Sequence, residues 1–351
     1  MATRQPAAGA IPEGFHTLQR EGLGLLDVGA RDGLHPLFRA IAPLVHALGV
    51  EPDREECARL QAEPPTVSWR SVRYLPFALG GSDGQATFHV CRSRGANSLY
   101  RPNHRWLSRF PDPARYEVVC TQTVPVRALD TLRQDPTLPI PPAIDFIKLD
   151  IQGAELDVLQ CARQILDREV VGLEVEVEFA PVYEGQPLFR DIDAFLASCG
   201  FSLFKLRRKS WVRHVCAERP AVSAGQLIAA DALYLRDPLT LEPEARRAWS
   251  AHRLEALLLV AALYDLHDFC LELVADPILA ARVDVEAIAR YVGRRACGLD
   301  YRLNGDGWFL SGARLAKECF KGRSGFGNLY AWRLRRSWGR ADSDKDFYTR
   351  T

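Results

Sequence analysis

One stretch near the start of the chain, residues 23–53, limits the possible folds more than any other part of the sequence. It reads LGLLDVGARDGLHPLFRAIAPLVHALGVEPD. Residues 23–28 are typical of a short buried strand, and a turn with two glycines follows. The apolar spacing of residues 34–41 predicts a helix, and residues 45–50 predict a second strand that ends at Glu51. This order of elements is the mononucleotide-binding half of a doubly wound α/β fold.

The spacing of the glycines indicates which nucleotide the turn would bind. A dinucleotide site requires G-x-G-x-x-G, whose backbone amides hold a pyrophosphate. Here the turn reads D-x-G-x-x-x-G, from Asp27 through Gly29 to Gly33. The carboxylate of Asp27 would repel a diphosphate but attract an amino group and a sulfonium, and Glu51 could accept both hydroxyls of a ribose. These features favour S-adenosylmethionine over a nicotinamide dinucleotide.

A second informative stretch, IDFIKLDIQGAELDVL, spans residues 144–159. It predicts a strand that ends at Asp150, followed by a helix with Glu155 in its first turn, where the helix dipole favours an acid. Ligands of open α/β sheets bind beyond the carboxyl ends of the strands, so Asp150 is placed for chemistry. The alternative interpretation is that Asp150 only caps the helix after it.

Three carboxylates alternate along the next predicted strand, residues 170–179. Glu174, Glu176 and Glu178 share one of its faces, although a central parallel strand is usually apolar on both faces. Lys148 could pair with one of them if the two strands are neighbours. Two interpretations remain open: a structural cluster of ion pairs and a polar active-site mouth, of which the second is preferred.

Composition argues against several other classes of protein. Lys and Arg number 45 and Asp and Glu 44, so no overall positive charge favours nucleic acid. The nine cysteines are scattered singly, which argues against a disulfide framework or a zinc site and for a reducing compartment, the cytoplasm. No apolar run reaches the roughly 18 residues of a transmembrane helix, and no signal-peptide core precedes the first strand.

The sequence pattern changes after the dipeptide at residues 237–238. The chain beyond this point is predicted to be mainly helical, and residues 321–340 combine six basic residues and four aromatic residues with no acid. Such a segment can bind a partner or an anionic surface, or it can be a solvated helix face with buried rings. We expect an N-terminal extension over residues 1–20, a catalytic domain over 21–238, and a C-terminal helical appendage over 239–351 that handles the acceptor, a partner or assembly into a homo-oligomer.

Five motifs, in this order along the chain, resemble those of FkbM-family methyltransferases. They are LLDVGARDG, GVEPD, PFALGGSDGQATF, IDFIKLDIQGAELDVL and EVEFAPVYEGQPLFRDIDAFLASCGF, and the resemblance spans residues 23–235. It implies a class I S-adenosylmethionine-dependent methyltransferase: a doubly wound, mostly parallel seven-stranded sheet with helices on both faces and a late antiparallel strand. It also implies O-methylation of a hydroxyl on a sugar, glycan, polyketide or related metabolite, so the expected partner is a small-molecule or glycan acceptor.

The resemblance further implies which residues hold the cofactor. Asp27 and Gly29 would line its methionine side, Glu51 would hold the ribose, and Ala78 or Asp83 would border the adenine. The full cofactor-binding set is Asp27, Gly29, Ala30, Gly33, Glu51, Pro52, Asp53, Ala78, Asp83 and Asp150. One residue of the turn, Arg31, replaces a frequent Asn of the family, and the sequence does not explain this change.

Methyl transfer to an alcohol needs a group that takes the hydroxyl proton. Asp150 is the first candidate for this base, with Glu155 beside it in the K-x-D-x-[EQ]-G-A-E motif. His35 is an alternative because imidazole titrates in the useful range, although it also suits an ordinary position at the start of a helix.

A divalent metal is a less favoured route to the same chemistry. Asp150 with Glu176 or Glu178 would supply the oxygen ligands that magnesium, calcium or manganese prefer. Gln152 stands where many family members carry Glu, which removes one carboxylate and weakens this case. A non-catalytic scaffold, whose basic-aromatic C-terminal segment binds a partner or surface, is the alternative to an enzyme. The polar loop at residues 94–113 is either a binding element or a surface loop.

Overall fold

A computed structural model of the protein describes residues 12–216 and 223–302. The described residues form two compact units, one made of residues 17–242 and the other of residues 12–16 together with 243–302. The division between Glu242 and Pro243 is close to the boundary expected at residue 238.

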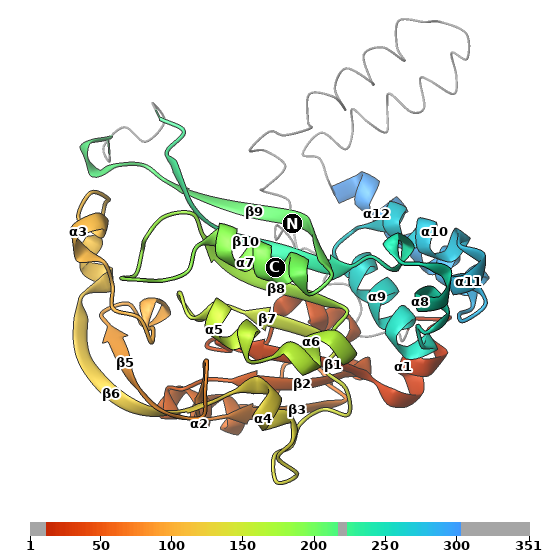
Figure 1. The fold of residues 1–351 in the computed structure, drawn as a ribbon, viewed down its shortest axis with the longest axis horizontal. Helices are drawn as coiled ribbons and strands as arrows, with labels where there is room; N and C mark the ends of the chain where they lie inside the picture. The colour runs from red at the N-terminus through yellow and green to blue at the C-terminus, as the bar shows by residue number, and fades with distance from the viewer. Residues whose placement is uncertain (1–11, 217–222, 303–351) are drawn as a thin grey trace, which may run out of the picture. The chain divides into compact units, whose positions relative to one another are not determined.

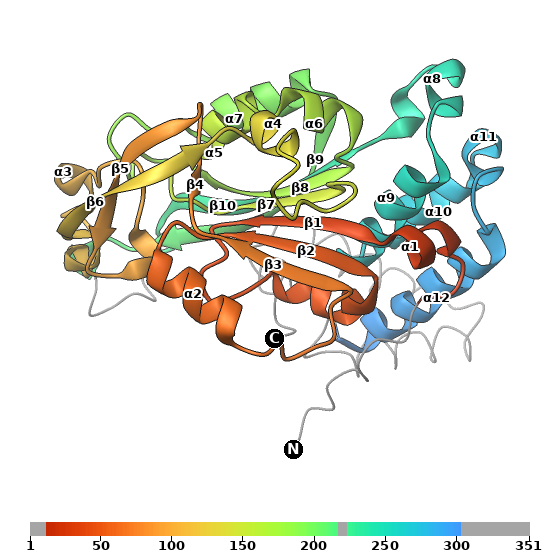
Figure 2. The same cartoon turned by 90° about the horizontal axis from the view of Figure 1, so that it is seen from below.

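The first unit contains a seven-stranded sheet in the order β3-β2-β1-β7-β8-β10-β9 (Figure 2). The first five strands in this order run parallel, whereas β10 runs antiparallel to both of its neighbours. This is the mostly parallel sheet with a late antiparallel strand that the motifs predicted. The strands are β1 (Leu23–Val28), β2 (Val45–Val50), β3 (Ser71–Leu75), β7 (Phe146–Leu149), β8 (Gly172–Glu178), β9 (Phe201–Trp211) and β10 (Gln226–Arg236).

Four helices cover one face of this sheet and enclose the main apolar core of the unit (Figure 2). Leu173, Val175 and Val177 of β8 belong to that core and are fully buried. Burying such a side chain stabilises a fold by about 1.5–3 kcal/mol, so the alternation fixes which face of β8 turns inward. The intervening glutamates therefore point to the opposite face. The covering helices are α4 (Leu129–Arg133), α5 (Glu155–Gln160), α6 (Arg163–Arg168) and α7 (Phe189–Ser198).

The 3-10 helix η1 (Pro36–Leu44) packs on the opposite face of the sheet. Its Phe38 contacts Phe146 of β7, with ring centroids 5.1 Å apart. The sequence predicted a helix over residues 34–41, and the structure has a 3-10 helix there that begins two residues later and ends three residues later. Pro36 starts the element and Pro43 lies inside it, and a proline ring supplies no N–H for the regular α-helical pattern.

A small second sheet, in the order β4-β6-β5, belongs to the same unit. The stretch from Ser71 to Leu79 is divided between the two sheets, as β3 and β4, because Pro76 between them has no N–H to donate. The single helix expected after Gly153 is likewise divided into α5 and α6 at Cys161.

The elements not yet given are α1 (His16–Glu21), α2 (Arg54–Ala62), β4 (Ala78–Leu79), β5 (Gly84–Cys91), η2 (Arg94–Ala96), α3 (His104–Leu107), η3 (Pro113–Tyr116), β6 (Val118–Arg127), η4 (His214–Cys216) and η6 (Pro238–Thr240).

The described residues of the second unit from Pro243 onward form helices (Figure 1). The stretch from Pro243 to Ala275 is divided into three helices, and Asp265 adopts a left-handed φ of 61° between the last two. Asp284 accepts the backbone N–H of Ala287 at 3.0 Å and caps the helix that follows it. The helices are α8 (Pro243–Arg247), α9 (Ala251–Leu263), α10 (His267–Ala275), α11 (Pro277–Ala280) and α12 (Val285–Arg302).

Two expectations from the sequence concern the basic-aromatic segment near the end of the chain and the absence of a transmembrane helix. The basic-aromatic segment, residues 321–340, lies outside the described residues. Within residues 12–216 and 223–302, every helix is too short or too polar to cross a membrane.

Candidate active site

A cleft of about 270 Å³ opens at the carboxyl ends of β1, β2 and β7. Its size is near the lower end of the roughly 300–1,000 Å³ that small-molecule sites occupy. The polar loop after β5 contributes Arg94, Gly95, Asn97 and Leu99 to the wall, so this part of the loop belongs to the cleft. Six of the residues expected at the cofactor also line the cleft: Gly29, Gly33, Glu51, Pro52, Ala78 and Asp150.

The glycine turn fits closely against the end of β7. Gly29 has a φ of +81°, and a Cβ there would lie 2.0 Å from the carbonyl oxygen of Asp150, so only glycine is accommodated. The amides of Gly29 and Ala30 donate to the carbonyl of Val50 at 3.0 and 3.2 Å. These two amides are occupied within the protein, which leaves them unable to hold a pyrophosphate. Gly33, with a φ of +102°, faces open space in the cleft.

Asp27 lies beneath the turn instead of lining the cleft. Its side chain is 1% exposed, and Oδ2 accepts the backbone N–H of His35 at 2.7 Å. Its Oδ1 lies 3.6 Å from Nζ of Lys148. The carboxylate of Asp27 therefore stabilises the turn through its hydrogen bond to His35. It does not line the cleft, so it can influence a ligand there only through its charge.

Glu51 presents a free oxygen to the cleft. It is 4% exposed, and its Oε1 accepts the backbone N–H of Asp53 at 2.8 Å, whereas Oε2 has no partner among the described residues. Burial raises the pKa of Glu51 to about 7, although the Asp53 N–H and the Arg31 guanidinium oppose this shift. A buried carboxylate with one unused oxygen can accept the hydroxyls of a ribose.

Three other residues of the expected cofactor set have structural partners. Asp53 caps α2 by accepting the N–H groups of Glu55 and Glu56, and it lies 3.4 Å from Arg31. Arg31 also lines the cleft. Its contact with Asp53 holds the segment after β2 against the glycine turn. Asp83 accepts the N–H of Ala128 at 2.7 Å. Neither these two aspartates nor the buried Ala30 lines the cleft.

Asp150 reaches the cleft directly after β7, and its side chain is 35% exposed. Nζ of Lys148 lies 3.5 Å from its Oδ2, and Nε2 of Gln152 donates to its Oδ1 at 2.8 Å. Burial opposes the charge, but the ammonium groups of Lys148 and Lys209 and the Gln152 amide outweigh it and hold the pKa of Asp150 well below its usual range. Asp150 is therefore an anion at neutral pH.

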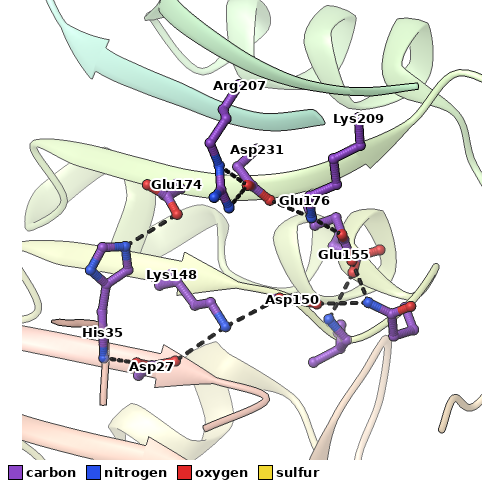
Figure 3. A network of polar contacts seen from close by, with 12 residues as sticks. Asp27, His35, Lys148, Asp150, Glu155, Glu174, Glu176, Arg207, Lys209 and Asp231 are labelled. Atoms are coloured by element: carbon purple, nitrogen blue, oxygen red, sulfur yellow. Dashed lines mark hydrogen bonds and ion pairs between the residues drawn. The ribbon is translucent and has the colours of Figure 1, made fainter. Parts of the chain in front are cut away.

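A polar network extends from Asp150 across the sheet (Figure 3). The Gln152 amide also donates to Glu176, and Oε1 of Glu176 lies 2.5 Å from Nζ of Lys209 on β9. Lys209 lies 3.0 Å from Asp231 of β10, to which Nε of Arg207 donates at 2.6 Å. Lys209, Asp231 and Arg207 were not predicted, although an Asp within the apolar run of β10 was a usable signal.

The three glutamates of β8 have different environments. Glu174 pairs with His35, whose Nε2 is 3.1 Å from Oε1. Burial raises the pKa of Glu176 and that of Glu178 well above the ordinary value, and nearby carboxylates add to both shifts while Lys209 opposes them. The expected pairing of a β8 glutamate with Lys148 was wrong, because Lys148 contacts Asp27 and Asp150 instead.

The two other candidate catalytic residues do not line the cleft. His35 accepts the N–H of Leu37 at Nδ1 and thereby caps η1, which leaves Nε2 to face Glu174. Both oxygens of Glu155 accept backbone N–H groups, from Ile151 at 2.8 Å and Gly153 at 2.9 Å. These two bonds fix the turn that carries Gln152, so Glu155 supports the site without touching the cleft.

A comparison with known families decides the class of protein. The family described as Methyltransferase FkbM domain matches residues 27–203, which is half of the chain. The chain belongs to the FkbM methyltransferase family. It is an S-adenosylmethionine-dependent methyltransferase of the FkbM type, as the motifs indicated. No curated protein matches this sequence.

Several solved structures are similar to this FkbM methyltransferase. The methyltransferase FkbM of Methylobacillus flagellatus KT is 17% identical, with a TM-score of 0.36 over 64% of this chain and 48% of that one. An S-adenosylmethionine-dependent methyltransferase of Mesorhizobium loti is 12% identical, with a TM-score of 0.33 over 63% and 95% of the two chains. Magnesium protoporphyrin IX methyltransferase of Synechocystis PCC 6803, with bound SAM, is 10% identical, with a TM-score of 0.31 over 64% and 76%.

The cleft of this FkbM domain suits S-adenosylmethionine better than it suits a metal ion. The unused Oε2 of Glu51 and the open space at Gly33 leave room and an acceptor for the nucleoside. Two of the three carboxylates proposed as metal ligands already face cations, Lys148 for Asp150 and Lys209 for Glu176, whereas Oε2 of the buried Glu178 has no hydrogen-bond partner among the described residues. Within residues 12–216 and 223–302, no group of three or more His, Cys, Asp or Glu side chains could hold a metal ion.

Proposed function

We propose that the protein methylates a hydroxyl group of a small acceptor, such as a sugar, glycan, polyketide or related metabolite. The observation that carries this proposal is the charged carboxylate of Asp150, which lines the cleft and remains partly exposed there. An alcohol keeps its proton at neutral pH, so its methylation requires a nearby proton acceptor. Of the carboxylates that line the cleft, Glu51 is assigned to the ribose, and we assign this role to Asp150.

The residues of the cleft divide the task between them. Glu51 and the turn at Gly29 would hold the cofactor, and S-adenosylmethionine supplies a methyl group already activated on a sulfonium when it is bound. The remaining work of the chain is to position the acceptor oxygen and to receive its proton. Asp150 does both if the acceptor hydroxyl donates a hydrogen bond to it, since this aims an oxygen lone pair toward the cleft.

The low pKa of Asp150 is compatible with this role. A hydroxyl proton becomes strongly acidic as its oxygen forms the new bond to carbon, so even a weakly basic carboxylate can take it at that stage. The charge of Asp150 must be present before the reaction begins, and Lys148 and Gln152 maintain it. General-base assistance of this kind contributes about 10²–10⁴-fold to a rate.

The proposal is tested by finding the atom that receives the methyl group. The full chain is incubated with methyl-labelled S-adenosylmethionine and extracts of its source organism, and labelled products are identified by mass spectrometry and NMR. We expect a methyl ether on a low-molecular-weight product. Label on nitrogen or carbon would contradict O-methylation while leaving the methyltransferase assignment intact.

We also propose the cytoplasm as the compartment in which the protein acts. The seven cysteines within the described residues are all free thiols, which suits a reducing environment. We likewise propose that the C-terminal region assembles the protein into a homo-oligomer. Sedimentation of the full chain tests this.

A further inference from the structure

A second hollow, of about 570 Å³, lies on the small sheet of the first unit, apart from the cofactor cleft. Its lining residues come from the loop that carries α3 and from strands β5 and β6. Figure 1 shows these elements together at the left of the picture. Its lining residues are His89, Arg101, His104, Glu117, Val118 and Thr121.

The backbone places these side chains on one side of the small sheet. Phe88 and Val90 of β5 turn inward to a buried apolar cluster, so His89 between them points to the other face. His89 is paired in register with Thr121 of β6 on that face. His104 is the first residue of α3, and the loop before it brings Arg101 to the same hollow.

The hollow has a positive electrostatic character. Its one acidic residue, Glu117, is neutralised by an ion pair with Arg92, whereas Arg101 forms no ion pair with any described residue. The segment that covers it, residues 92–117, contains six arginines and only two acids. Burial is the main cause that lowers the pKa of His89, the Arg101 guanidinium adds to this shift, and Glu184 opposes it.

The hollow and the cofactor cleft share one segment of chain as a common wall. Arg94, Gly95, Asn97 and Leu99 line the cleft, and Arg101 and His104 line the hollow. In the same segment, the carbonyl of Ser98 accepts the N–H of His89 at 2.8 Å, and its hydroxyl donates to the carbonyl of Gln152 at 2.7 Å. The side chain of Gln152 donates to Asp150, so three hydrogen bonds connect His89 of the hollow with the proposed base.

We infer that this hollow binds an anionic group, a carboxylate, sulfate or phosphate, carried by the methyl acceptor. The inference rests on the proposed function, because it assigns a chemical class to the acceptor of that reaction. Arginine suits such a ligand since its planar guanidinium donates two parallel hydrogen bonds to a carboxylate or phosphate. The imidazoles of His89 and His104 also line the hollow and can donate, so an acceptor anchored here would be an acidic sugar or glycan rather than a neutral one.

The inference is tested by calorimetric titration of the full chain with four probes. They are glucuronate and glucose 6-phosphate, with glucose as the neutral control and inorganic phosphate as the free-anion control. We expect one of the two anionic sugars to bind, glucose not to bind, and inorganic phosphate to bind more weakly than the anionic sugar. Equal binding of glucose, absence of binding by both anionic sugars, or inorganic phosphate binding as tightly as the sugar would overturn the inference.

Two exposed arginines of the same loop provide the matched variants. Arg101→Gln should weaken the anionic sugar by about tenfold or more, because it removes a charge-assisted contact. Arg105 lies in α3 but outside the hollow, so Arg105→Gln should leave the affinity for the anionic sugar unchanged. Both variants should bind S-adenosylmethionine as the wild type does. Equal loss in both variants would mean a diffuse charge effect and would overturn the site. If the sugar binds as described but label goes to nitrogen or carbon, the proposed function fails separately from this binding site.

Discussion

The ammonium nitrogen of Lys148 lies 3.5 Å from a carboxylate oxygen of Asp150 at the mouth of the cofactor cleft. The same nitrogen lies 3.6 Å from the carboxylate of Asp27, which is 1% exposed beneath the glycine turn. One cation thus compensates two carboxylates, one structural and one placed for chemistry. Lys148 is therefore expected to influence the pH dependence of the reaction as well as the stability of the fold.

Replacing Lys148 with Met should move the acid limb of the pH–rate profile to higher pH. Lys148 lowers the pKa of Asp150, and activity requires the deprotonated carboxylate, so activity is lost as pH falls through that pKa. Removing the cation raises the pKa and brings this loss to a higher pH. Lys148→Arg keeps the charge and is the matched control. An acid limb at the same pH in Lys148→Met and wild type would show that another group governs the limb.

Replacing Asp150 with Asn should lower turnover by about 10²–10⁴-fold, because it removes the proposed proton acceptor. S-adenosylmethionine should still bind, since Gly29, Gly33 and Glu51 of the same cleft are unchanged. Asp167→Asn, 48% exposed and paired only with Arg163 on α6, is the control and should retain full activity. Wild-type activity should also survive a chelator. Near-normal turnover of Asp150→Asn would remove Asp150 as the base, and loss of activity with chelator, reversed by metal, would restore the metal route.

Replacing Glu51 with Ala should weaken S-adenosylmethionine by about tenfold to a hundredfold, which corresponds to the roughly 1.5–3 kcal/mol of a charge-assisted hydrogen bond. Glu63→Ala, whose side chain is 58% exposed after α2, is the control for a general loss of negative charge. Calorimetric titration measures both affinities. If the two variants bind the cofactor equally well, Glu51 does not hold the ribose.

Affinity for S-adenosylmethionine should increase between pH 6 and pH 8, because burial raises the pKa of Glu51 to about 7. Below that pH the side chain is protonated and has lost the charge that strengthens its bonds to both hydroxyls. Arg31 lowers the pKa of Glu51, so Arg31→Gln should move the midpoint of this titration upward. Titrations at a series of pH values measure the midpoint, and a flat profile in wild type would contradict the assignment.

A fragment of residues 17–242 should fold and bind S-adenosylmethionine with an affinity close to that of the full chain. The first unit has its own apolar core between the sheet and the helices α4 to α7, and all residues of the cleft belong to it. Circular dichroism and calorimetric titration of the fragment check this. An insoluble or unfolded fragment would mean that the remaining residues are part of the folding unit.

The strands of the large sheet and the position of Asp150 could be predicted because they rest on local patterns of alternation and turn chemistry. The partners of Glu176 could not, since Lys209 reaches it only because β10 and β9 pair beyond β8, and this pairing joins distant parts of the sequence. The environment that sets the pKa of Asp150 depends on the same pairing. His35 was a candidate base by residue type, but the backbone turned it toward Glu174, away from the cleft.

The close approach of Gly29 to Asp150 has a consequence for how such a site can change. A methyl group at position 29 would collide with the backbone of the residue proposed as the base, 2.0 Å away. The turn proposed to hold the methyl donor and the strand end proposed to receive the acceptor are thus in direct backbone contact. Because these two backbones touch, a rearrangement of the turn would act directly on the segment that carries Asp150.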